Sequence, residues 1–241
     1  MVAGPPKPKF VDLTLVLDSN RIQGYPGDDP FVFRQVSADG QDGCSNIKIG
    51  SMTFGSVHTG THLDAPFHFI ANGKTIEQIP LSDLIGPALV IDLSGNNLQP
   101  RQQITWADLS SWHAHMREGV TVLIHTGWSE HHWYTPQYYH HPYLTADAAE
   151  GLVASGIRTV GLDTLSPDET PIDGIGGKYG FKFHEIFLGA GGIIAENLVN
   201  LSALTEEEGT TDGRGMWIVN LIPLSLHGSD GSPIRAFAYR A

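Results

Sequence analysis

The sequence contains little of what several protein classes require. It has one cysteine, Cys44, so no disulfide can form within the chain. No run of about 18 apolar residues is present, which argues against a membrane-spanning helix. The segment 1–10 has no apolar stretch of the kind that a secretory signal contains. These absences predict a cytoplasmic protein with no membrane partner.

Positive charge and two common catalytic motifs are also scarce. The 14 Lys and Arg residues stand against 26 Asp and Glu, a net charge of −12, and an acidic chain repels the phosphate backbone of nucleic acid. No G-x-S-x-G segment is present, so the serine mechanism of the α/β-hydrolases has no nucleophile elbow. Cys44 lies in D-G-C-S-N, which is not a catalytic signature, and an inert thiol is expected there.

Strand-like and helix-like segments are interspersed along the whole chain, with no linker or repeat to divide it. Residues 1–9 are rich in Pro and Lys and predict a flexible arm, and residues 10–241 predict one mixed α/β domain. Apolar and alternating runs predict strands over 10–17, 31–37, 46–54, 88–93, 120–126, 159–162, 217–224 and 234–239. Helical spacing and capping residues predict helices over 81–84, 105–117 and 145–155, and 191–198 fits either type.

Three histidines and an aspartate lie within eleven residues: His58, His62, Asp64 and His68. On a straight strand they would share a face, but the strand would span roughly 33 Å, whereas ligand atoms lie about 2 Å from a metal ion. The segment must therefore bend if these residues meet, and Gly60 and Pro66 are where it can. Both residues also disfavour a helix. The residues alone leave two interpretations open, a metal site or ordinary core and surface histidines.

The segment 58–69, HTGTHLDAPFHF, resembles the H-x-G-x-H-x-D-x-P-x-H signature of the cyclase-like metal hydrolases. This family includes the bacterial-type kynurenine formamidases and the isatin hydrolases. Further segments resemble other blocks of the family, and the similarity covers about 10–240. These segments are YPGDDPF at 25–31, HTGW at 125–128, GLDTLSPD at 161–168 and the closing P-L and D-G-S-P-I-R-A at 223–236.

The resemblance implies a two-metal centre whose ions share a bridging carboxylate. The first ion is expected on His58, His62 and Asp64, and the second on Asp64, His184 and Glu196. His68 matches the family's acid/base residue, and Glu185 is a weaker rival to Glu196. Imidazole and carboxylate ligands without cysteine suit catalytic Zn²⁺ or Mn²⁺, with two ions expected per chain.

The resemblance also implies a fold and a reaction. The fold is the swivelling α/β fold of the family, a mixed, barrel-like β-sheet core with surrounding helices. The reaction is hydrolysis of a C–N bond in an aryl formamide or cyclic amide, with N-formyl-kynurenine as the first candidate; isatin, lactones and cyclic imides remain open. A non-catalytic binding protein and a serine or cysteine hydrolase are the alternatives of other classes. A homodimer or homotetramer is expected.

The segment 128–143 is rich in histidine and aromatic residues and contains two prolines, which predict a loop. Three interpretations are open: a second metal patch, a lid over an aromatic substrate, or a packed surface segment. Metal binding is disfavoured because Glu130 is the only acidic residue there. Asp163 and Asp168 are expected to shape a turn and not to act in catalysis.

Overall fold

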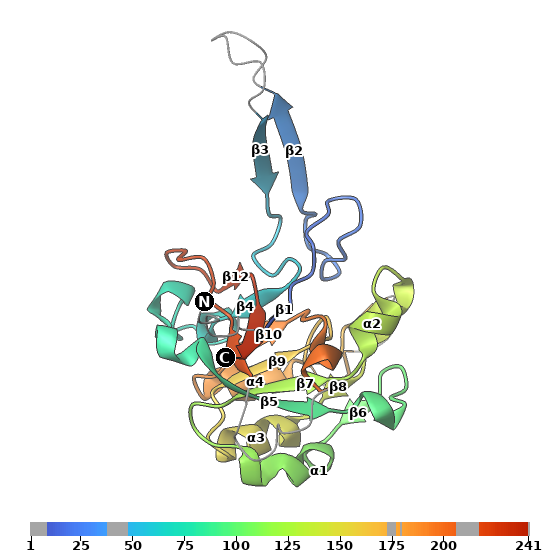
Figure 1. Cartoon of the computed structure of the whole chain (residues 1–241), viewed down its shortest axis with the longest axis vertical. Helices are drawn as coiled ribbons and strands as arrows, with labels where there is room; N and C mark the ends of the chain where they lie inside the picture. Colours follow the sequence, from blue (N-terminus) through green and yellow to red (C-terminus); the bar gives the residue numbers. More distant parts are fainter. Residues whose placement is uncertain (1–8, 38–47, 173–176, 179, 206–216, 241) are drawn as a thin grey trace, which may run out of the picture.

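The structure is a computed structural model that describes residues 9–37, 48–172, 177–178, 180–205 and 217–240. The expected arm lies outside these ranges except for Lys9, and Cys44 also lies outside them. A nine-stranded sheet forms the centre of the molecule and curls into a half-barrel, as the family resemblance implies (Figure 1). Its strands follow one another in the order β1 (Lys9–Asp12), β13 (Phe237–Arg240), β11 (Ile218–Asn220), β5 (Ile85–Asp92), β7 (Thr121–His125), β9 (Thr159–Leu162), β10 (Ile193–Glu196), β4 (His62–Asp64) and β12 (Gly231–Pro233).

The four central strands β5, β7, β9 and β10 are parallel, and the strands on both sides of them pair antiparallel. Alternation along a central strand sends its side chains to two cores. Val122 and Ile124 join the core beneath the helices, whereas Leu123 joins the core on the other face. The central strands therefore read as continuous apolar runs, because both of their faces are buried.

Helices α3 (Ala146–Ala154) and α4 (Lys182–Gly189) pack against each other on one face of the sheet, with α1 (Trp106–Leu109) beside α3. Helix α3 confirms the helix predicted over 145–155, and Gly156 follows it with a φ of +80°. In Figure 1, α1 and α3 lie at the end of the body farthest from the β2–β3 hairpin. No helix within the described ranges is long and apolar enough to cross a membrane.

The strand expected over 10–17 and the helix expected over 105–117 both differ in extent from the structure. The strand predicted over 10–17 ends at Asp12, because its partner β13 begins only at Phe237. The helix predicted over 105–117 is α-helical only as α1 and continues as the 3-10 helix η5 (Ser110–His115). Its Ser, Trp and His residues are weaker helix formers than Ala or Leu. The ambiguous segment 191–198 forms the strand β10.

The loop expected over 128–143 is wrong for most of its length. It forms α2 (Trp128–His132), the 3-10 helix η6 (Pro136–His140) and the short strand β8 (Tyr143–Leu144). Pro136 begins η6 because a proline at the first position of a helix loses no hydrogen bond. The Trp128 indole N–H donates to the Tyr138 carbonyl at 3.2 Å and ties the two helices together.

A hairpin of two strands, β2 (Val32–Ser37) and β3 (Lys48–Thr53), projects from the body (Figure 1). The two strands pair with each other and with no other strand of the described chain. Both were predicted, over 31–37 and 46–54. The remaining short elements are η1 (Pro66–His68), η2 (Ile76–Gln78), η3 (Leu81–Asp83), η4 (Ser94–Asn96), β6 (Gln103–Ile104) and η7 (Leu201–Leu204).

Candidate metal centre

Strands β4 and β10 place three of the expected ligands on one face of the sheet. Glu196 lies opposite His62 in the antiparallel register, and Asp64 follows His62 by two residues. Alternation sends all three side chains towards the helices, while Leu63 and Ala195 enter the core on the other face. Helix α4 covers the helix-side face and contributes His184.

The segment before and after β4 bends where the sequence allows it. Gly60 has a φ of +66°, which lets the chain turn between His58 and the strand. Pro66 begins η1, which turns the chain again after the strand and carries His68. Close approach on the other side depends on Gly231 of β12, where a Cβ atom would lie 2.6 Å from His58 Cε1.

Two buried histidines of the centre, His62 and His184, are held by their Nδ1 atoms. His62 Nδ1 lies 2.8 Å from the carbonyl oxygen of Gly60, and so carries the proton of the neutral ring. His184 Nδ1 lies 2.6 Å from Asp168 Oδ2, whose carboxylate also accepts the backbone N–H of His184 at 3.0 Å. Each ring therefore presents Nε2 to the centre, as metal-binding histidines do when a second group fixes the other nitrogen.

Two carboxylates stand between these two imidazoles. His62 Nε2 lies 3.2 Å from Asp64 Oδ1 and 3.3 Å from Glu196 Oε2. His184 Nε2 lies 3.5 Å from Asp64 Oδ2 and 3.3 Å from Glu196 Oε1. All four side chains are buried, and His62 Nε2 and Asp64 Oδ2 have no hydrogen-bond partner among the described residues. Buried polar atoms without partners are rare, and a cation among them would satisfy both.

His58 and His68 lie at the rim of this group and share one carboxylate. His58 Nδ1 contacts Asp64 Oδ1 at 2.7 Å, and its Nε2 lies 3.1 Å from Asp230 Oδ2. His68 Nδ1 also lies 3.1 Å from Asp230 Oδ2. The two rings face each other with their centroids 4.1 Å apart. Asp230 thus fixes the orientation of both imidazoles.

The charges of the centre stabilise one another. Burial alone would lower the pKa of His58 and His62, but Asp64 and its neighbouring carboxylates outweigh burial and raise these pKa values to about 9 and about 10. Burial opposes the charge of Asp64 and Glu196 too, yet the histidines hold the pKa of both carboxyls below its usual value. The carboxylates therefore favour the protonated forms of His58 and His62 when no cation is bound.

This donor set fits a divalent cation. Two groups of three residues have ligand atoms within 4.8 Å of one another, and both contain Asp64: His62–Asp64–Glu196 and His58–Asp64–His68. A shared Asp64 is what a bridging carboxylate requires. The grouping differs from the expected one in three respects: His62 is grouped with Glu196 and not with His58, His184 is in neither group, and His68 is grouped with His58.

A pocket of about 280 Å³ opens onto the centre. Its walls beyond the metal-binding group are largely aromatic and apolar. The Phe69 ring stacks on the His184 imidazole at 4.7 Å between centroids, and Phe181 lies 5.6 Å from Phe69. The other lining residues outside the group of histidines and carboxylates are Tyr25, Asp28, Ser56, Leu165 and Ser166. The pocket therefore suits a small, flat ligand whose surface is mostly apolar.

Two carboxylates near the centre have contacts that the sequence did not reveal. Asp230 lies within the closing block, but its partners His58 and His68 are more than 160 residues away along the chain. Asp168 was expected only to shape a turn, and that expectation is incomplete, because its carboxylate holds His184 and the first turn of α4. Asp163 accepts the backbone N–H groups of Thr126 and Gly127, and so holds the chain where it leaves β7.

Two other candidates lie away from the pocket. Glu185, the rival of Glu196, is exposed and pairs with Lys182. No residue of 128–143 lines the pocket, and the residues described there form no group of three possible metal ligands. Trp128 and Tyr138 instead pack with Leu165 in a small buried cluster. The segment is therefore a packed part of the fold and not a lid.

Comparison with known proteins gives consistent matches over most of the chain. Residues 11–169 match the family model Cyclase, described as "Putative cyclase". Kynurenine formamidase of Bacillus cereus is 34% identical over 229 residues, which cover 95% of this chain and 96% of that protein. Isatin hydrolase A of Labrenzia aggregata, solved with benzyl benzoate, superposes with a TM-score of 0.80 at 27% identity, over 96% of this chain and 93% of that one. A predicted metal-dependent hydrolase of Bacillus stearothermophilus gives a TM-score of 0.71 at 27% identity, over 97% and 99%.

Proposed function

Because this chain belongs to the cyclase family, we propose that it is a metal-dependent hydrolase that cleaves the C–N bond of a small aryl formamide or cyclic amide. N-formyl-kynurenine is the first candidate substrate, and kynurenine and formate would be its products. The curated relative named kynurenine formamidase supports this choice, since it aligns over nearly the full length of both chains.

One observation carries the proposal. Two buried imidazoles with fixed Nδ1 atoms point their Nε2 atoms at two buried carboxylates, and the group opens into a pocket with aromatic walls. A structural zinc site would be closed by four protein ligands, whereas a catalytic site keeps a position open. The pocket beside Asp64 and His184 supplies that open side.

The proposed cofactor is two Zn²⁺ or Mn²⁺ ions per chain, which His58, His62, His184 and Glu196 would hold together with Asp64, the ligand that both ions would share. His62, His184 and Glu196 contact Asp64 or each other from the buried side, and His58 approaches Asp64 from the rim. When bound, the ions would polarise the substrate carbonyl and lower the pKa of a water molecule towards ~7. The contacts of Gly60 with His62, of Asp168 with His184 and of Asp230 with His58 orient these three imidazoles.

His68 is the proposed general acid and base of the hydrolysis. Its ring lies at the pocket wall, partly exposed, with Nδ1 held by Asp230, so Nε2 is left for the substrate side. In the proposed reaction His68 takes a proton as the oxygen of water bonds to the carbonyl carbon. It then delivers that proton to the leaving nitrogen as the C–N bond breaks, which releases the amine and the carboxylate.

Isatin hydrolysis is the second candidate reaction. Hydrolytic ring opening of a lactone or of a cyclic imide ranks after it. The structural match to isatin hydrolase A and the mostly apolar pocket favour a neutral bicyclic ring. The same chemistry applies, because the cyclic amide of isatin also presents a carbonyl and a leaving nitrogen. The two candidates differ in the amino-acid group, which N-formyl-kynurenine carries and isatin lacks.

A metal-reconstituted substrate panel tests the proposal. Wild-type protein loaded with Zn²⁺ or Mn²⁺ is assayed on N-formyl-kynurenine, isatin, a cyclic imide and a lactone, with metal content measured in parallel. Turnover of the first two and about two ions per chain are expected. His62→Ala should lose both metal and turnover. Absence of turnover on every substrate of the panel would favour a non-catalytic binding protein. Turnover that persists in the presence of a chelator would point to a serine or cysteine hydrolase.

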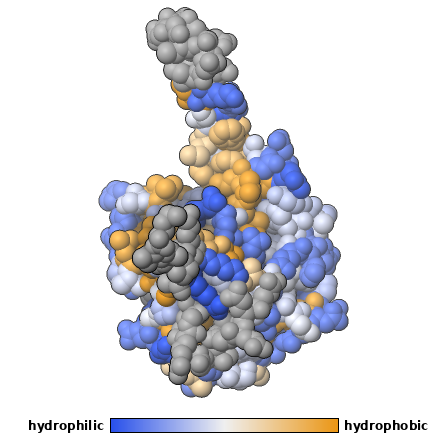
Figure 2. Space-filling view, in the orientation of Figure 1, coloured by the Kyte–Doolittle hydropathy of each residue, from blue (hydrophilic) through white to orange (hydrophobic). Residues whose placement is uncertain are grey.

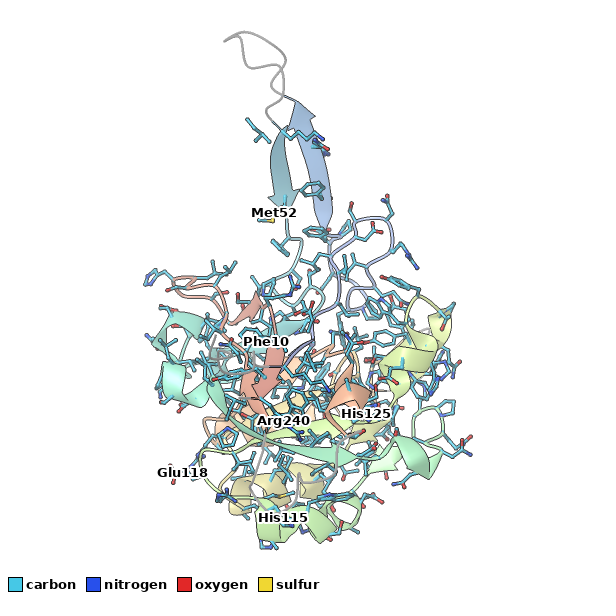
Figure 3. The ribbon with its side chains drawn as sticks, in the orientation of Figure 1. Phe10, Met52, His115, Glu118, His125 and Arg240 are labelled. Carbon is cyan, nitrogen blue, oxygen red and sulfur yellow. The ribbon has the colours of Figure 1, made fainter. Side chains whose placement is uncertain are left out.

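We further propose that a second copy of this chain covers the β2–β3 hairpin in a homodimer or homotetramer. An isolated two-stranded ribbon is marginally stable in water, and this one pairs with no other strand of the described residues. Phe33 and Met52 face each other across the strands and are 53% and 63% exposed. Apolar side chains gather around the base of the hairpin (Figure 2), and Met52 lies on its flank (Figure 3).

A further inference from the structure

The Tyr25 hydroxyl is a buried polar group at the pocket that has no partner. The Tyr25 ring packs against the cluster of Trp128, Tyr138 and Leu165 and lines the pocket beside the metal-binding group. Its hydroxyl oxygen is buried and forms no hydrogen bond to any of the described residues. Such a group destabilises the folded chain, because it has left water without gaining a new partner.

Neighbouring hydroxyls differ from Tyr25 in this respect. Tyr138, in the same cluster, donates to Asn197 Oδ1 at 2.7 Å. The two serine hydroxyl oxygens at the pocket each accept a backbone N–H, Ser56 from His58 and Ser166 from Asp168. Tyr25 is therefore the pocket-lining hydroxyl, among the residues described, whose hydrogen-bonding capacity is wholly unused.

The surroundings of Tyr25 keep it a neutral donor. Burial, followed by nearby carboxylates led by Glu196, raises the pKa of Tyr25 to about 12. The phenol therefore keeps its proton over the whole range in which the protein would work. A hydroxyl hydrogen can rotate towards a new acceptor without any movement of the ring.

We propose that Tyr25 is a catalytic residue whose hydroxyl donates a hydrogen bond to the carbonyl oxygen of the amide held in the pocket. That oxygen gains negative charge when water adds to the carbonyl carbon, and a donor fixed in advance stabilises the charge as it develops. The inference rests on the proposed hydrolysis for the identity of the acceptor. The unpaired hydroxyl at the pocket does not depend on it.

Tyr25→Phe separates this role from a structural one. Removing an unpaired buried hydroxyl should leave the unfolding temperature of the metal-free protein unchanged or higher. The metal-loaded variant should bind as many ions as wild type, but its kcat/KM on N-formyl-kynurenine or isatin should fall about 10- to 100-fold. Tyr139→Phe is the matched control, because Tyr139 is a half-buried tyrosine of the same cluster that does not line this pocket.

A binding measurement distinguishes failure of the inference from failure of the proposed function. Anthranilate, an aryl carboxylate that offers acceptor oxygens, is titrated into the metal-loaded wild type, Tyr25→Phe and Tyr139→Phe. Weaker binding by about tenfold or more in Tyr25→Phe alone supports the inference, even if wild type hydrolyses nothing in the panel.

Four results would overturn it. Equal anthranilate affinity in Tyr25→Phe and wild type would show that the hydroxyl contacts no ligand. Absence of anthranilate binding to wild type would show that the pocket does not bind an aryl carboxylate. Lower metal content in Tyr25→Phe would assign the residue to the metal site instead. A lower unfolding temperature would show that the hydroxyl already has a partner in the empty pocket.

Discussion

Metal binding to this centre should release protons near neutral pH. In the metal-free protein, neighbouring carboxylates raise the pKa of His58 to about 9 and that of His62 to about 10, against the opposing effect of burial. The pKa of His184 is also raised, with burial again opposing and Asp168 foremost among the groups that raise it. A histidine must be neutral to bind a metal, so each of these ligands exchanges a proton for the cation.

The expected magnitude follows from the two pKa values. At about pH 7.5 both His58 and His62 are almost fully protonated, so loading both should release about two protons, or about three if His184 also loses one. Deprotonation at that pH opposes metal binding by about 2 kcal/mol at His58 and about 3 kcal/mol at His62. With two protons released, the apparent affinity should rise about 100-fold per pH unit between about pH 7 and 9.

The same protons determine how stability varies with pH. A histidine whose pKa is raised by folding stabilises the metal-free protein fully below its unfolded pKa of about 6.5. That contribution is lost as the pH rises through about 9 and about 10, the folded values for His58 and His62. The unfolding temperature of metal-free protein should therefore fall from about pH 7 to 10, while that of the metal-loaded protein should change much less.

Isothermal titration of Zn²⁺ into metal-free protein, in two buffers with different ionisation enthalpies, measures the proton count directly. His227→Gln is the matched control, because the His227 side chain is fully exposed and pairs with Glu77, which is not part of the centre, and the count should not change. A count near zero at about pH 7.5, or a metal affinity independent of pH, would refute the ion-paired cluster described above.

The remaining predictions concern catalysis, ligand orientation and assembly. His68→Gln should lower kcat by about 10²- to 10⁴-fold, because His68 transfers a proton from water to the leaving nitrogen. The metal content should equal that of wild type, and a lower content would make His68 a metal ligand instead. Asp168→Asn should weaken metal affinity about 10- to 100-fold, because His184 loses the carboxylate that fixes its ring; unchanged affinity in a chelator competition would contradict this. The double substitution Phe33→Ser with Met52→Ser should shift sedimentation towards the monomer, and an unaltered oligomer would place the interface elsewhere.

Local sequence determined the elements whose signals lie within a few residues. The apolar run 120–126 became β7, and the capped segment 145–155 became α3. The bends at Gly60 and Pro66 follow from the intrinsic backbone preferences of glycine and proline, which do not depend on distant parts of the chain. The run 105–117 shows the limit of such signals, since only its first turn is α-helical and the rest tightens into a 3-10 helix.

The sequence by itself determined which side chains are available to a metal, through the spacing of His58, His62 and Asp64 and the resemblance that this spacing carries. Only the tertiary structure decided what surrounds them. Pairing of β4 with β10 and β12 placed Glu196 opposite His62 and brought Asp230 to His58, from more than 130 residues away. The unpaired Tyr25 hydroxyl likewise follows from packing. Contacts between distant segments depend on strand register and on the shape of the whole core, and no local pattern of residues encodes either.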